Sequence, residues 1–299
     1  MSDSTAYVMG HDDRERRRLR LQASILNPLT EQLFHRAGIS SGMNVVDIGC
    51  GVGDVSLLAG RLVGPSGSVT SVDIDPDALA ALEARAAAAG MSNIDCIQAN
   101  IHGWKPGRQF DAVVGRHILI HSPDPLGVLR DCAALLCDRG LAVFHEYDFS
   151  VVHRGWPPTP LRDRLMEVFD QFFGRVSCSN IGSRLWKLLM DAGFQCPDCR
   201  AEYPISGGSD SVYHEWFIES FRSIYPRAVA MGIIGDGRVR PRHTRTTHPR
   251  RSRSWELHSG PRDDRGVCTS ARMTTYGICR MKSRQPPMPS HRNDNGPRD

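Results

Sequence analysis

The sequence predicts an α/β fold with a doubly wound, mostly parallel sheet. Short apolar runs alternate with helical segments, and turns rich in Gly, Pro or Asp separate them. The runs are apolar along their length, as in strands that helices cover on both faces. They lie at residues 43–50, 68–73, 93–98, 110–117 and 141–148. A sheet of this kind binds ligands at the carboxyl ends of its strands.

The helices between these strands begin at clear sequence signals. Segment 54–62 follows a glycine-rich turn, and Asp75–Pro76 opens an alanine-rich helix that stops at Gly90. Asp124–Pro125 opens another helix, which runs through Leu136. Each helix separates two predicted strands, which is the order expected of a parallel sheet.

Further helices are predicted on either side of this core. Residues 11–26 carry a charge-rich helical pattern. Asn27–Pro28 then supplies an N-cap and a first-turn proline for a second helix that ends at Gly38. Beyond residue 150 we predict helices at 161–174, 180–192 and 211–232 and a strand at 194–205.

The chain divides into four parts. Residues 1–38 are predicted to form N-terminal cap helices, 39–150 the ligand-binding core, 151–235 a helical lid with the far edge of the sheet, and 236–299 a basic tail. Val, Ile, Leu and Phe supply only four of the 64 tail residues, so we expect most of the tail to be disordered. The tail has 15 Lys and Arg against 6 Asp and Glu, whereas residues 1–235 have 22 against 27.

The composition favours a cytoplasmic protein. The first residues are polar, and no apolar run approaches the ~20 residues of a membrane span. The nine cysteines are scattered through apolar segments, as expected of reduced core positions. The one Cys-x-x-Cys, at Cys196 and Cys199, has no second pair. We therefore expect neither a disulfide framework nor a metal site.

A glycine-rich turn follows the first predicted strand. In DIGCGVG, Gly49, Gly51 and Gly53 stand at alternate positions between a buried strand and a helix. Glycine is needed where the backbone must turn sharply and approach a ligand closely. A dinucleotide-binding fingerprint has the spacing Gly-x-Gly-x-x-Gly, but Asp54 stands where its third glycine belongs. The spacing therefore disfavours a dehydrogenase.

Two acidic residues accompany this turn. Asp47, two residues before Gly49, would repel a pyrophosphate but suits a ligand that carries an ammonium group. Asp73 ends the second strand, where a carboxylate can accept hydrogen bonds from both ribose hydroxyls. Together with three later segments, SVDIDPDAL, IQANI and FDAVVGRHIL, the segment VVDIGCGVGD resembles the successive motifs of class I S-adenosylmethionine-dependent methyltransferases. The resemblance spans roughly residues 7–230 and implies the family's Rossmann-like fold, with S-adenosyl-L-methionine as the cofactor.

The resemblance also implies cofactor-binding roles by position. Asp47 and the turn at Gly49, Gly51 and Gly53 would lie against the methionine half of the cofactor, and Asp73 would bind the ribose hydroxyls. The first motif, VVDIGCGVGD, is the most specific part of the match.

Weaker assignments follow later in the chain. Ile74 would lie on the adenine face, and Asn100 stands where many members have an aspartate facing the adenine amino group, although a plain loop role is equally open. Ile101 would offer its backbone nearby, and the backbone at Arg116 would contact the cofactor. The segment that resembles the N-terminal cap of related small-molecule enzymes contains Tyr7, Arg18 and Gln22.

The reaction implied by the resemblance is an in-line displacement that needs no metal. Alignment supplies much of the rate of such a step. A hydroxyl or amine acceptor must also lose a proton, and a general base would add about 10² to 10⁴. The residue that acts as the base is not identified by the sequence. Candidates at the carboxyl ends of the fourth and fifth strands are His121, His117 and Glu146, each of which has a structural role as its alternative.

Three functional readings follow. The favoured one is methyl transfer from S-adenosylmethionine to a small-molecule acceptor. The second is a catalytically defective, cofactor-binding homologue with an incomplete sheet. The third is nucleic-acid binding by the tail, which we rank last because residues 1–235 lack a basic stripe. No feature of the sequence indicates a membrane partner or an oligomeric state.

The incomplete sheet concerns the last strand. The family completes its sheet with an antiparallel hairpin, and residues 194–205 fit the first arm. The second arm should lie in the tail, whose arginine- and proline-rich sequence after Gly235 resembles translation out of frame. The alternative is that CTSARMTTYGICRM, at residues 268–281, supplies the missing strand.

Overall fold

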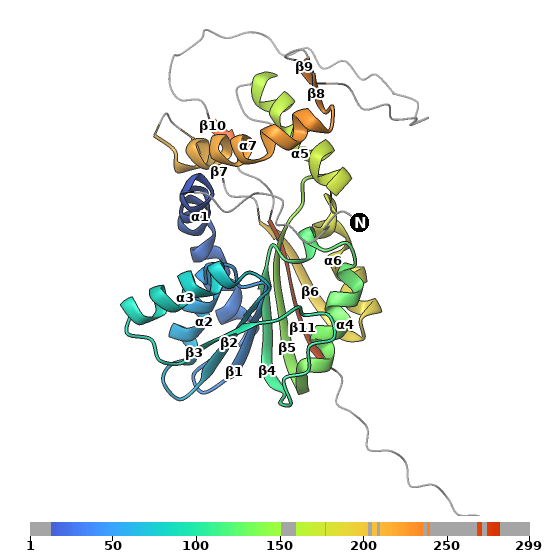
Figure 1. Cartoon of the computed structure of the whole chain (residues 1–299). Coiled ribbons are helices and arrows are strands. Elements are labelled where there is room, and N and C mark those ends of the chain that lie inside the picture. The colour runs from blue at the N-terminus through green and yellow to red at the C-terminus, as the bar shows by residue number, and fades with distance from the viewer. Residues whose placement is uncertain are drawn as a thin grey trace, which may run out of the picture.

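The computed structural model has helices on both faces of one central sheet, which is the predicted α/β architecture (Figure 1). It describes residues 13–150, 160–176, 178–202, 205–207, 210–235, 238–239, 268–270 and 274–281. No helix in these ranges is long and apolar enough to cross a membrane.

Seven strands form the sheet, in the order β3-β2-β1-β4-β5-β11-β6. Their bounds are β1 Asn44–Ile48, β2 Ser68–Asp73, β3 Ile94–Gln98, β4 Phe110–Arg116, β5 Leu136–Tyr147, β6 Phe194–Glu202 and β11 Thr274–Met281. The first five strands are parallel to one another. Because their carboxyl ends meet at one edge, residues that follow β1, β2 and β4 are brought together there.

Neighbouring residues of the central strands point to opposite faces of the sheet. Val45 packs in one buried cluster and Val46 in another, and Val143 and Phe144 divide in the same way. This division explains why the strands are apolar throughout, since both faces are covered.

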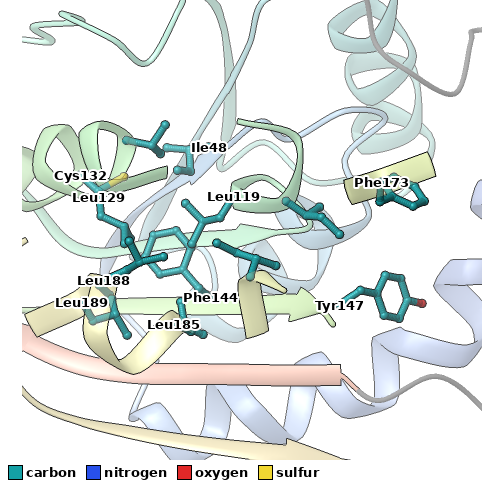
Figure 2. Packing of buried hydrophobic residues seen from close by; sticks show 14 of the residues in the cluster. Ile48, Leu119, Leu129, Cys132, Phe144, Tyr147, Phe173, Leu185, Leu188 and Leu189 are labelled. Atoms are coloured by element: carbon teal, nitrogen blue, oxygen red, sulfur yellow. The ribbon is translucent and has the colours of Figure 1, made fainter. Parts of the chain in front are cut away.

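Six α-helices follow the first strand in the part of the chain that the structure describes. They are α2 Asp54–Val63, α3 Pro76–Ala88, α4 Pro125–Leu135, α5 Pro160–Val176, α6 Ile181–Asp191 and α7 Val212–Ala230. Helices α4 and α6 cover the face that carries Phe144, where Leu129 and Cys132 of α4 and Leu185 of α6 join one apolar cluster (Figure 2). The α2 side chains Val55 and Leu58 pack on the opposite face.

The last strand of the sheet comes from the tail. Strand β11 lies between β5 and β6 and is antiparallel to both, from Thr274 opposite Tyr147 to Arg280 opposite Leu141. Of the two alternatives for this arm, the segment at residues 268–281 therefore supplies the strand. The second functional hypothesis assumed that the sheet lacks this strand, and that assumption is therefore wrong.

The N-terminal prediction of two helices was wrong. Residues Asp13–Ala37 form one helix, α1, with Pro28 inside it. Leu26 before the proline and Phe34 after it are both buried, so packing carries the helix through the position where the proline removes one backbone donor. Asn27 does not act as an N-cap; its side chain instead accepts a hydrogen bond from Arg116.

Helices α5 and α7 lie beyond the carboxyl end of β5. The Tyr147 ring at the end of β5 lies 5.6 Å from the ring of Trp216 on α7, and Phe149 stacks on Phe173 of α5 at 4.3 Å. Helix α7 also packs along α1 (Figure 1). Two short pairs, β7 (Ile205–Gly207) with β10 (Cys268–Ser270) and β8 (Ile234–Gly235) with β9 (Arg238–Val239), complete the described elements. An aromatic layer therefore covers this end of the sheet.

Candidate functional site

The glycine turn joins β1 to α2 in a left-handed conformation. Gly51 has φ 51° and Gly53 has φ 86°, values that L side chains rarely adopt. The two positions differ in their surroundings. A Cβ at Gly53 would lie 2.1 Å from Cδ1 of Leu82, whereas a Cβ at Gly51 would meet no atom within 4 Å. Packing within the protein therefore explains Gly53, and Gly51 faces open space where a ligand can approach the backbone.

Asp73 lies directly against this turn. Its Oδ2 accepts a hydrogen bond from the Gly51 backbone N–H at 2.8 Å, and its Oδ1 accepts one from the Asp75 N–H at 3.0 Å. Each carboxylate oxygen retains further acceptor capacity. The end of β2 therefore holds a carboxylate, fixed in orientation, beside the open side of the glycine turn. Asp75 caps α3 by accepting a hydrogen bond from the Asp77 N–H, as its place at the predicted helix start indicated.

Asp47 lies deeper than the sequence suggested. Its side chain is only 1% exposed, and its Oδ2 accepts a hydrogen bond from the Ser56 hydroxyl at 2.6 Å. Ser71 in turn donates to Ser56 at 2.9 Å. Burial raises the pKa of Asp47 to about 7. The carboxyl group therefore supports the glycine turn from inside the protein. Any effect of its charge on a bound ammonium group would be exerted across the turn.

Replacing Asp47 by asparagine is expected to stabilise the protein above neutral pH. The folded state holds the Asp47 proton more tightly than the unfolded chain, whose aspartate pKa is 3.8. Stability is therefore lost as the pH rises from about 4 to about 7, by up to ~4 kcal/mol. Asparagine retains the hydrogen bond from Ser56 and carries no charge. Urea unfolding from pH 5 to pH 8 measures the difference, which should grow with pH.

The matched control for this experiment is Asp95→Asn. Asp95 is exposed on β3, and its replacement should leave the pH profile unchanged. If Asp47→Asn follows the wild-type curve at every pH, the buried carboxyl group does not carry the penalty we assign to it.

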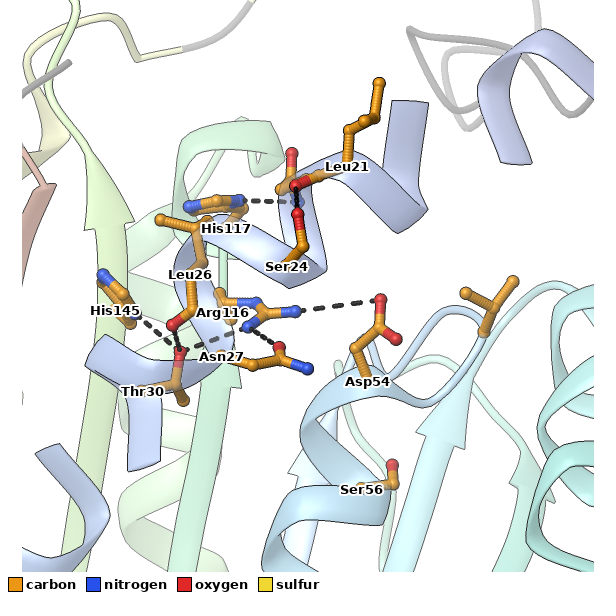
Figure 3. Close-up of polar contacts among 12 residues, drawn as sticks. Leu21, Ser24, Leu26, Asn27, Thr30, Asp54, Ser56, Arg116, His117 and His145 are labelled. Atoms are coloured by element: carbon orange, nitrogen blue, oxygen red, sulfur yellow. Dashed lines mark hydrogen bonds and ion pairs between the residues drawn. The ribbon is translucent and has the colours of Figure 1, made fainter. Parts of the chain in front are cut away.

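The Arg116 side chain connects α1 to the start of α2. Its Nη1 donates to Oδ1 of Asn27 at 2.8 Å and to Oγ1 of Thr30 at 3.1 Å, and its Nη2 lies 3.8 Å from Oδ2 of Asp54 (Figure 3). The side chain is 5% exposed. The sequence indicated the Arg116 backbone and missed the roles of Asn27 and Thr30, because Asn27–Pro28 looked like a helix start.

The three residues predicted to lie on the adenine side, Ile74, Asn100 and Ile101, differ in their surroundings. Ile74, which follows β2, is 50% exposed, an unusual exposure for a large apolar side chain at a strand end. Asn100 is exposed and its Oδ1 accepts a hydrogen bond from the His102 N–H at 3.0 Å, which is a loop-stabilising contact. Ile101 packs partly against the core. Ile74 is therefore free to cover an apolar ring, whereas Asn100 is already used within its loop.

Glu146 is buried and holds a loop in place. Its Oε1 accepts hydrogen bonds from the backbone N–H groups of Ile118 at 3.1 Å and Leu119 at 2.9 Å, and its Oε2 accepts one from Ile120 at 3.2 Å. These donors open the short helix η1 (Leu119–His121). Burial raises the pKa of Glu146 to about 8. The geometry gives Glu146 the structural role that was its alternative.

The two histidine candidates are partly buried beside aromatic rings. His121 lies beside Phe173 at 6.2 Å, and burial lowers its pKa to about 4. His117 stacks on Tyr147 with ring centroids 4.0 Å apart, and burial lowers its pKa well below 6.5. Both rings are therefore neutral at pH 7.

The residues predicted for the N-terminal cap lie on α1 where the structure describes them. Arg18 and Gln22 lie on α1, and the Gln22 side chain contacts His117; Tyr7 lies outside the described residues. In the described ranges no group of three His, Cys, Asp or Glu side chains gathers closely enough to hold a metal ion.

Comparison with known proteins matches the part of the chain that contains the glycine turn and the strand ends described above. A family described as "Methyltransferase domain" matches residues 39–190, just over half of the chain. Aklanonic acid methyltransferase DauC of Streptomyces sp. (strain C5) is 32% identical over 127 residues, which cover 42% of this chain and 57% of that protein. A ubiquinone biosynthesis O-methyltransferase of Escherichia coli O157:H7 (strain EC4115 / EHEC) is 33% identical over 122 residues, which cover 40% and 49%. The matched segments thus span about half the length of these relatives.

Solved structures share the fold at low identity. The YcgJ protein from Bacillus subtilis superposes with a TM-score of 0.53 at 12% identity, covering 84% of this chain and 97% of that one. A likeness at this identity supports the strand order and the layers around the sheet.

Proposed function

This chain belongs to the methyltransferase-domain family, and from that membership we propose that it transfers a methyl group from S-adenosyl-L-methionine to a small-molecule acceptor. The observation that carries the proposal is the open approach at Gly51 beside the fixed carboxylate of Asp73. If S-adenosyl-L-methionine lies against the backbone at Gly51, its ribose can reach the Asp73 carboxylate.

The described residues fit each part of the cofactor. Asp73 would accept hydrogen bonds from the ribose hydroxyls, and the exposed side chain of Ile74 would cover the adenine ring. The turn around Gly51 would hold the methionine half, with the buried carboxyl group of Asp47 behind the turn. When bound, S-adenosylmethionine supplies an electrophilic methyl group on a sulfonium. Asn100, already bonded within its loop, is the weakest of the proposed contacts.

The chain's contribution to the reaction is alignment in an aromatic enclosure. Tyr147, Phe149, Phe173 and Trp216 are buried at the carboxyl end of β5, and their packing would close the end of the sheet where an acceptor must stand to face the methyl group. These apolar surroundings favour a partly apolar acceptor, in keeping with the aklanonic acid and the ubiquinone biosynthesis that the names of the relatives print. Positioning alone supplies a large part of the rate of a displacement.

No strong base is proposed for the acceptor. Glu146 is occupied by three backbone donors, and the lowered pKa values of the partly buried His117 and His121 make both rings weak bases. An acceptor that is already ionised at neutral pH, such as a carboxylate or an acidic phenol, needs no proton removal. This class of acceptor therefore suits the site best.

The cofactor assignment is tested by calorimetric titration with S-adenosylhomocysteine beside NAD. We expect the homocysteine adduct to bind and NAD to bind at least 100-fold more weakly. Binding of NAD alone would overturn the assignment. Binding of the adduct without transfer of labelled methyl to any carboxylate or phenol would favour the defective homologue.

We also propose a cytoplasmic site of action, which the free cysteines of the described residues support.

Alanine variants of Gly51 and Gly53 distinguish an effect on ligand binding from an effect on packing within the protein. Gly51→Ala is expected to cost ~1–2 kcal/mol of stability, because only the left-handed backbone is strained. It should nevertheless lower S-adenosylhomocysteine affinity more than about tenfold, because its Cβ occupies the ligand's approach. Gly53→Ala adds overpacking against Leu82, which costs a further ~1–3 kcal/mol.

Chemical unfolding and calorimetry on both variants measure these effects. The ratio of affinity loss to stability loss should be much larger for Gly51→Ala. Equal ratios would mean that the space at Gly51 is not where the ligand lies.

A further inference from the structure

His117 is held rigidly at the end of β4. Its backbone has φ 57°, which is uncommon for a residue other than glycine, and its N–H donates to the carbonyl of His145 at 3.0 Å. Its ring stacks on Tyr147 with the planes inclined by 22°. Residues held in such a conformation tend to cluster at functional sites, because the surroundings must maintain them.

Helix α1 determines which nitrogen of His117 carries the proton. Nη1 of Arg18 donates to Oε1 of Gln22 at 2.7 Å, and arginine has no acceptor atom. The Gln22 oxygen is therefore turned toward Arg18, and its amide nitrogen lies 3.3 Å from Nδ1 of His117. An amide nitrogen only donates, so Nδ1 must accept and the proton of the neutral ring is on Nε2.

The protonated nitrogen has no partner within the protein. Nε2 of His117 is buried and makes no hydrogen bond to any residue that the structure describes. Buried donors in folded proteins are nearly always satisfied, so this N–H marks a place for a ligand atom. Arg18 and Gln22, which fix the ring, are themselves 4% and 8% exposed, so the arrangement is built into the fold.

We propose that His117 is a ligand-binding residue that presents a neutral Nε2–H donor to an oxygen of the bound ligand, and that Gln22 and Arg18 are positioning residues that set this tautomer. The inference rests on the proposed function and deepens it. The partner is a carboxylate or carbonyl oxygen, which belongs either to the amino-acid end of the cofactor or to the acceptor. His117 then orients the ligand and does not remove its proton.

The tautomer is tested by nitrogen NMR on the full chain labelled with ¹⁵N-histidine. His117→Phe, which keeps a ring against Tyr147, identifies the His117 signals by their loss. We expect a protonated Nε2 and a bare Nδ1 from pH 6 to pH 8. A protonated Nδ1, or titration of the ring within this range, would overturn the proposal.

Gln22→Glu tests the positioning role. A carboxylate only accepts hydrogen bonds, so it should draw a proton to Nδ1 of His117 and change that nitrogen's signal. The control is His145, whose Nδ1 contacts Oγ1 of Thr30 and not Gln22, and whose signals should not change. An unchanged His117 tautomer in this variant would show that Gln22 does not set it.

The source of the oxygen is found by adding ligands to the labelled protein. If the oxygen is the cofactor's, S-adenosylhomocysteine shifts the Nε2–H signal and 5′-methylthioadenosine, which lacks the amino-acid end, does not. His117→Phe then weakens S-adenosylhomocysteine binding about tenfold, and His117→Gln restores part of the loss. If the oxygen is the acceptor's, benzoate shifts the signal in the S-adenosylhomocysteine-loaded protein. A signal that neither ligand shifts rejects the donor role, whereas absence of S-adenosylhomocysteine binding by calorimetry rejects the proposed function instead.

Discussion

Replacing Asp73 by alanine is expected to lower the affinity for S-adenosylhomocysteine by at least about 100-fold. In the proposed complex the carboxylate accepts hydrogen bonds from two ribose hydroxyls, each worth ~1.5–3 kcal/mol because the acceptor is charged. The variant also loses the bond that fixes the Gly51 N–H at 2.8 Å. Isothermal titration calorimetry at pH 7.5 measures the change directly.

Asp75→Ala is the matched control for this measurement. Asp75 lies two residues away on the same loop and caps α3, so its removal should cost ~1 kcal/mol of stability with little change in affinity. Asp73→Asn should fall between Asp73→Ala and wild type, since an amide oxygen can still accept one bond. If the two alanine variants bind the adduct equally well, Asp73 does not hold the ribose.

Replacing Glu146 by alanine is expected to destabilise the protein by ~3 kcal/mol or more. The change leaves the backbone N–H groups of Ile118, Leu119 and Ile120 without their acceptor, and a buried unsatisfied donor costs ~1–3 kcal/mol. Leu119 and Ile120 are at most 1% exposed, so water cannot readily replace the carboxyl group. Urea unfolding at pH 7 reports the loss.

Glu146→Gln is the companion variant. Its amide oxygen can still accept from Ile118 and Leu119, while its NH₂ group faces the N–H of Ile120, so an intermediate loss is expected. A Glu146→Ala protein as stable as wild type but inactive in methyl transfer would instead return Glu146 to the list of candidate bases.

Local patterns predicted the sheet because each strand is determined by its own residues. The run SVTSVD is β2 at the predicted bounds, and Asp73, which ends it, contacts the glycine turn. Apolar character along a run reports burial on both faces, and parallel order then places Asp73 beside Gly51 without further information.

Features that depend on distant contacts were not predictable in this way. The proline in α1 reads as a helix start, and only packing of α1 on the sheet keeps the helix continuous. Arg116 lies 89 residues from Asn27 in the sequence, so neither residue alone suggests their hydrogen bond. Likewise, the sequence did not indicate the burial of Asp47, because its hydrogen-bond donor, Ser56, lies nine residues later on α2.

The position of β11 has a consequence for synthesis of the protein. Strand β5 emerges from the ribosome long before Thr274–Met281, which pairs with it and separates it from β6. During that interval one edge of β5 carries unpaired backbone groups, and such edges invite association between chains. A premature stop anywhere before residue 274 would make that exposure permanent. Truncated products are therefore expected to aggregate or to be degraded, and full-length yield should depend on chaperones that shield nascent strands.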